Sequence, residues 1–212
     1  MVRSWVTRFA GVRTAWRVIG DGDFFCAACG GDRCYQRLAG RRRLTVLGVP
    51  VARRGDAEPV VECSSCHGRF LATALDVPTT TQLAGLLRDA VHTIALAVLG
   101  TDGQAVAARK AAVASIRAAG FPDCTHERLL TLQAALAADT LPLWESLTAL
   151  APHLEAPGRE ALVLHGAGIA LADGPYSPTE RTILTLIGEA LRLLPSETER
   201  LLSAAATDAS RP

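Results

Sequence analysis

The chain has 212 residues, of which 49% are hydrophobic and 5% aromatic, and its formal net charge is +1. Apolar residues, chiefly Ala, Leu and Val, are abundant enough for a globular core, which excludes a disordered chain. The charge is unevenly placed, because arginines are concentrated before Asp76 and the remainder carries an acidic excess. We therefore expect a basic N-terminal region joined to an acidic body.

No targeting segment is expected. Arginines interrupt the first twenty residues, which therefore lack the apolar run of a signal peptide. No stretch approaches the roughly 18 apolar residues of a transmembrane helix, so none is predicted. Lysine is almost absent beside arginine, which indicates a GC-rich bacterial genome. Paired cysteines without an export signal suit a reducing compartment, and a cytoplasmic location is predicted.

Residues 1–20 place apolar side chains at helical spacing, with arginines between them. We predict an amphipathic segment here: a helix, or a helix followed by a strand, packed against the rest of the protein. The alternative is an interfacial helix in peripheral contact with anionic lipid.

Two Cys-x-x-Cys pairs, Cys26 with Cys29 and Cys63 with Cys66, have the layout of a zinc ribbon. Four thiolates around one Zn²⁺ leave no open position, so the metal would be structural. Iron in a rubredoxin-like site stays open as an alternative, because such knuckles suit both metals. Cys34 and His67 lie close enough to compete as ligands, although we expect both to be bystanders.

The segment between the pairs is longer than is usual, which predicts an inserted loop. Residues 44–51 and 59–62 are predicted strands, joined through a turn at residues 53–56, and a closing strand is expected at residues 69–71. The same region holds a cluster of arginines: Arg37, Arg41, Arg42, Arg43, Arg53 and Arg54. The cluster suggests a nucleic-acid-binding ribbon as an alternative function, and an arginine face bridging to the acidic body is at least as well supported.

Asp76-Val77-Pro78 is the expected domain boundary, with threonine caps at residues 79–81. Beyond it, period and stop residues predict helices at 81–99, 104–119, 126–138, 143–151, 159–172, 178–194 and 196–206. Ser177-Pro178-Thr179-Glu180 is a predicted capping box. The domain prediction is an N-terminal segment at 1–20, a zinc ribbon at 21–75, a helical domain at 79–206 and a tail at 207–212.

An internal repeat appears when Asp102 is aligned with Asp173, because Asp102-Gly103 and Asp173-Gly174 then match, each between two predicted helices. Residues 169–180, which end at Glu180, resemble the signature of the TerB-like tellurite-resistance family: a helix ending in Ala-x-Ala-Asp-Gly, a polar turn, and a helix opening around a glutamate. The resemblance spans about 81–206, and Arg109 replaces the first-half glutamate. N-terminal zinc ribbons joined to such domains are similar to residues 11–70.

The resemblance implies an all-helical domain of duplicated hairpins, a role in bacterial stress response with protein partners, often near the membrane, and no enzymatic activity. It also implies a second, acidic metal site at Asp102, Asp173 and Glu180. Turn chemistry and helix capping explain the same residues without a metal.

The fold prediction is therefore mainly α, an all-helical TerB-like bundle with a small N-terminal β zinc ribbon. The predicted function is a non-catalytic adaptor or sensor that binds partner proteins, with Zn²⁺ as its cofactor.

Overall fold

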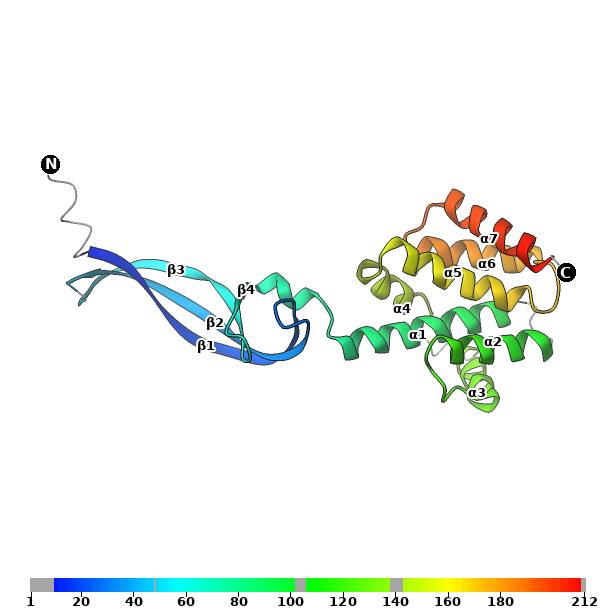
Figure 1. The fold of residues 1–212 in the computed structure, drawn as a ribbon, viewed down its shortest axis with the longest axis horizontal. Helices are drawn as coiled ribbons and strands as arrows, with labels where there is room; N and C mark the ends of the chain where they lie inside the picture. The colour runs from blue at the N-terminus through cyan, green and yellow to red at the C-terminus, as the bar shows by residue number, and fades with distance from the viewer. Residues whose placement is uncertain (1–9, 48, 102–105, 138–142, 211–212) are drawn as a thin grey trace. The chain divides into compact units, whose positions relative to one another are not determined.

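The computed structural model describes residues 10–47, 49–101, 106–137 and 143–210 (Figure 1). It divides into two compact units, Met1–Gln82 and Leu83–Pro212, called here the sheet unit and the helical unit. Asp102 and the glycine after it fall outside the described residues, as do residues 1–9.

The sheet unit is an antiparallel sheet in the order β1-β2-β3-β4. Its strands are β1 (Ala10–Cys26), β2 (Gly31–Val46), β3 (Val49–Cys63) and the short β4 (Arg69–Leu71). A 3-10 helix, η2 (Ala72–Asp76), follows β4. The three long strands have 17, 16 and 15 residues, which is well above the usual strand length of about 5–6.

The sheet corrects the predicted fold class, because the N-terminal β part is not a small ribbon: a four-stranded antiparallel sheet accounts for most of the described sheet unit. Of the two forms predicted for residues 1–20, a helix over the whole segment is wrong, since Ala10 to Val18 pair continuously with Val46 to Leu38 of β2. A strand in the later part of the segment agrees with the other form, a helix followed by a strand. Threonine, tryptophan and valine at alternating positions favour this pairing over the coincident helical spacing.

The predicted loop and turn between the cysteine pairs are also strand. The arginine-rich residues 41–43 lie within β2, and the turn expected at residues 53–56 lies within β3. The chain reverses before the predicted turn, between the end of β2 at Val46 and the start of β3 at Val49.

The described residues of the helical unit form seven α-helices, and each predicted helix has a counterpart. The bounds are α1 (Thr80–Leu99), α2 (Val106–Ala118), α3 (His126–Ala137), α4 (Leu143–Leu150), α5 (Ala156–Ala170), α6 (Pro178–Ala190) and α7 (Pro195–Ala209). A 3-10 turn, η3 (Ala151–His153), follows α4. Helix α7 continues three residues into the segment predicted as a tail.

Helix α5 is central to the helical unit, because it packs against α2, α6 and α7 (Figure 1). All seven helices contribute buried residues to one apolar core. Thr79 exchanges hydrogen bonds with Gln82 at the start of α1, and Ser177 does so with Glu180 at the start of α6, which confirms the predicted capping box.

Helix α1 also bears on the membrane prediction. Together with η2 it forms a helical stretch, Ala72–Leu99, that is long and apolar enough by length and composition to cross a membrane. Half of its most apolar window is buried within the protein, as expected also for the core helix of a globular domain.

Candidate functional site

The four cysteines of the two Cys-x-x-Cys pairs come together at one end of the sheet unit. Their sulfur atoms all lie within 4.8 Å of one another. The Sγ atoms of Cys26 and Cys66 are 3.8 Å apart, and those of Cys29 and Cys63 are 4.0 Å apart. Tetrahedral thiolates at about 2.3 Å from Zn²⁺ have S–S edges of about 3.8 Å, so the cluster has the dimensions of a four-thiolate metal site.

Two backbone turns present these sulfurs. The N–H groups of Cys29 and Gly30 donate to the Cys26 carbonyl, and Gly30 has a φ of 67° that favours glycine. In the second turn, the N–H of His67 donates to the Cys63 carbonyl and that of Cys63 to the Gly68 carbonyl. Each Cys-x-x-Cys pair is thus fixed by its own tight turn.

The thiols of the cluster have perturbed pKa values. Hydrogen bonds from the backbone N–H groups of Cys66 and Ser65 lower the pKa of Cys63 to about 6. The neighbouring Cys26 thiol, followed by burial, raises the pKa of Cys29 to about 12. The backbone thus prepares the Cys63 sulfur as a thiolate, whereas the Cys29 thiol needs a cation to lose its proton.

A small apolar cluster supports the site. Phe24, Cys26, Val61 and Cys63 are buried together, with Tyr35 and Phe70 packed against them. The rings of Tyr35 and Phe70 each meet that of Phe24 edge-on, at 5.6 and 5.8 Å. The sulfurs of Cys26 and Cys63 are therefore fixed in position by packed apolar side chains.

The alternative ligands lie apart from the cluster. Cys34 is exposed, and a hydrogen bond with Asp23 raises its pKa. His67 is exposed, and its Nδ1 lies 3.9 Å from the Glu62 carboxylate. Neither belongs to the group of ligand atoms that the described residues bring together.

The acidic site implied by the resemblance is only partly described. Asp173 is exposed in its turn, and Asp102 lies outside the described residues. The Glu180 side chain is buried, and its carboxylate accepts a hydrogen bond of 2.8 Å from the Ser177 N–H. Capping thus occupies Glu180, and metal binding at these three residues stays a prediction.

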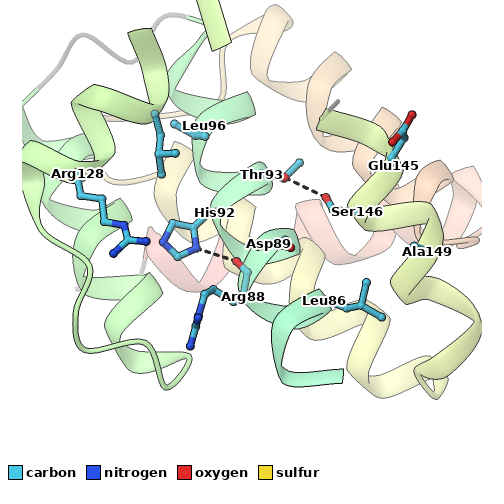
Figure 2. Close-up of a pocket in the computed structure, with 11 residues that line it drawn as sticks. Leu86, Arg88, Asp89, His92, Thr93, Leu96, Arg128, Glu145, Ser146 and Ala149 are labelled. Carbon is cyan, nitrogen blue, oxygen red and sulfur yellow. Dashed lines mark hydrogen bonds between the residues drawn. The ribbon is translucent and has the colours of Figure 1, made fainter. Parts of the chain in front are cut away.

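The helical unit contains a groove of about 500 Å³ that no sequence pattern predicted (Figure 2). Residues of α1, α3 and α4 line it: Leu86, Arg88, Asp89, His92, Thr93, Leu96, Arg128, Leu132, Glu145, Ser146 and Ala149. Leucines form its apolar part, and charged side chains of both signs stand around it. Because these residues come from three separated segments, only the packing of the helices brings them together.

Two hydrogen bonds order the groove. The hydroxyls of Thr93 and Ser146 are 3.0 Å apart and join α1 to α4. The Nδ1 of His92 lies 2.7 Å from the Arg88 carbonyl oxygen and donates to it, which leaves Nε2 on the side of Arg128 (Figure 2). The groove therefore has a basic side, formed by the Arg128 guanidinium next to the His92 ring.

The described site is a four-cysteine cluster at the end of a sheet, and it is joined in one chain to a seven-helix domain with a lined groove. Comparison with family models matches residues 88–203, more than half of the chain, to the family described as Tellurite resistance protein TerB. The chain therefore belongs to the TerB family, which supports a tellurite-resistance-like function at the level of the family. Comparison with curated proteins and with solved structures finds no significant match.

The family match covers nearly all of the helical unit and includes the whole lining of the groove except Leu86. It includes none of the four clustered cysteines, so the cluster is supported by its geometry alone.

Proposed function

We propose that this chain is a non-catalytic tellurite-resistance protein, in which a structural Zn²⁺ holds the sheet unit together and the helical unit binds a partner protein. The observation that carries the proposal is the closed four-thiolate cluster in the same chain as a TerB domain. Four protein ligands leave Zn²⁺ no open position for water or substrate, so the ion stabilises structure instead of catalysing a reaction.

We choose zinc over iron because a structural role suits the sheet unit, not because of the ligand composition. The ligand set is all sulfur with tetrahedral edges, which suits both metals. The sheet unit buries only a small apolar cluster, as expected where a structural metal supplies folding free energy. Nothing in this unit calls for electron transfer.

The groove of the helical unit is the proposed partner site. Leu96 is almost fully buried at its base, whereas the side chains of Arg88, Arg128 and Glu145 are exposed around it. An apolar centre with a charged rim is the ordinary anatomy of a protein interface. The partner segment would place an apolar side chain in the groove and an acidic residue against Arg128.

The test uses three variants of the full chain, read by metal content and by survival on tellurite in the native host lacking its own copy. Ala149→Trp fills the groove, and Ala204→Trp is its control, since Ala204 is exposed on α7 and does not line the groove. Cys26→Ser removes one ligand. We expect one zinc per chain in the wild type and in both tryptophan variants, and its loss with Cys26→Ser.

Survival should fall with Ala149→Trp and with Cys26→Ser, and stay at the wild-type level with Ala204→Trp. Full survival with Ala149→Trp would remove the groove as the partner site. Iron in place of zinc would overturn the choice of metal, and a chain without metal would overturn the structural role of the cluster.

A further inference from the structure

The end of the sheet opposite the cysteines carries an exposed apolar tip. Where β2 meets β3, four aliphatic side chains face solvent, with exposed fractions of 37% for Val46, 72% for Leu47, 60% for Val49 and 56% for Val51. Single exposed aliphatic residues are common, but four within six positions form a patch that needs an explanation. We call these four residues the hairpin tip.

Arginines stand directly behind the hairpin tip. Arg13 of β1 pairs with Arg43 of β2, and Arg43 pairs with Arg53 of β3, so three arginines lie side by side across three strands. All three are exposed. Like charges directly opposite one another destabilise a sheet, so this row is costly unless an anion is bound to it.

The composition around the row strengthens its charge. Arg42 and Arg54 are exposed at the neighbouring positions of β2 and β3, and Arg53 forms an ion pair of 3.2 Å with the Asp56 carboxylate. The row and its two neighbours therefore keep a clear positive excess. We call Arg13, Arg43 and Arg53 the arginine row.

The spacing of the two features matches the layers of a membrane surface. Arg43 precedes Val46 by three positions along β2, which is about 10 Å at about 3.3 Å per residue. Interfacial segments bury their apolar side chains about 5–10 Å into the boundary of headgroups and acyl chains. An aliphatic tip at that depth would leave the arginine row at the level of the phosphates.

We propose that the hairpin tip docks onto an anionic phospholipid surface, with its four aliphatic side chains at the acyl boundary and the arginine row on lipid phosphates. Nucleic acid would also suit the arginines, but the tip has no aromatic side chain on which bases could stack. A second copy of the chain could cover aliphatic residues, but it would bring its own arginine row towards this one. The proposal is independent of the groove in the helical unit.

The test measures sedimentation of the full zinc-loaded chain with phosphatidylcholine vesicles, with and without phosphatidylglycerol. Leu47→Asp combined with Val49→Asp places charge on the tip, and Arg43→Glu reverses charge in the row. Leu47 has a φ of 53°, a conformation that Asp adopts more readily than Leu, so the turn should persist. Leu71→Asp is the control, since Leu71 is 58% exposed on β4, away from the tip.

We expect binding only to vesicles that contain phosphatidylglycerol, and we expect it to weaken as salt increases. Both the tip variant and Arg43→Glu should lower vesicle affinity by at least about tenfold, the response expected when apolar burial or lipid attraction is removed. Leu71→Asp should bind like the wild type, and circular dichroism and zinc content should be unchanged in every variant.

Three results would overturn the proposal. Vesicle binding that survives the tip variant would show that the tip does not insert. Binding of duplex or single-stranded DNA without vesicle binding would assign the arginine row to nucleic acid. A concentration-dependent dimer that the tip variant dissociates, again without vesicle binding, would assign the tip to a second copy.

Discussion

The sheet unit buries Phe24 and Val61 with two of its metal-site cysteines, whereas the helical unit buries apolar residues from all seven helices in one core. A segment with so little apolar burial gains too little free energy to offset the loss of chain entropy. In the sheet unit, cysteines make up part of the buried cluster, whereas the core of the helical unit consists mainly of aliphatic side chains. Under the proposed function, the comparison teaches that one chain can stabilise one part by a metal and the other by apolar packing.

The comparison is tested most strongly by removing the metal. With a chelator, or with Cys63→Ser, we expect strands β1 to β4 to lose protection around the cysteines, because structural zinc sites contribute about 10–16 kcal/mol to folding. Helices α5 to α7 should keep their protection. Hydrogen exchange read by mass spectrometry separates the two responses.

Ser64→Ala is the control for that experiment, since Ser64 is exposed in the same turn and offers no sulfur. Loss of protection in both units after chelation would contradict the comparison, because it would show that the two fold as one cooperative unit.

The apolar side of the comparison is tested by two glycines of α5. A Cβ at Gly166 would lie 2.9 Å from both Ile94 Cγ2 and Leu184 Cδ2, whereas a Cβ at Gly168 meets nothing within 4 Å. We expect Gly166→Ala to destabilise the helical unit by about 1–3 kcal/mol through overpacking. Gly168→Ala should be neutral or stabilise it by up to about 1 kcal/mol, because alanine favours the helix.

Urea unfolding followed by circular dichroism gives both values. If the two alanine variants have the same midpoint, α5 is not packed as closely as these distances indicate, and the core of the helical unit is looser than the comparison requires.

The helical unit was predictable from sequence because its signals are local. Helix period, proline and glycine stops, and the capping box of Ser177 and Glu180 each act within a few residues, so they appear in the sequence as they act in the fold. The clustering of the four cysteines was predictable for the same reason, since each Cys-x-x-Cys pair is closed by its own turn. The family resemblance also rested on one continuous stretch.

The sheet was not predictable because its signals are long-range. Residues 10–18 have apolar positions that fit a helix, and only the pairing with β2 makes them strand. The arginine row and the groove could not be predicted from the sequence for a related reason. Arg13, Arg43 and Arg53 meet through register, and the groove residues meet through packing of α1, α3 and α4.

The smallest predicted effect concerns His165 of α5, which the apolar core holds neutral. Burial, followed by the charge of His92, lowers its pKa from 6.5 to about 4, and its Nδ1 lies 2.7 Å from the Ser115 hydroxyl. The unfolded chain binds this proton more readily, so the contribution is complete above the unfolded pKa and is lost as pH falls towards the folded one. We expect a loss of about 1 kcal/mol between about pH 7 and about pH 5.5.

His165→Gln should flatten this part of the pH dependence, because glutamine has no proton to take up. His153→Gln is the control, since His153 is exposed at the end of η3 and should leave the slope unchanged. Unfolding free energies from urea titrations across this pH range measure both slopes. An unchanged slope with His165→Gln would mean that water reaches His165. The packing around α5 would then exclude less water than the comparison with the sheet unit assumes.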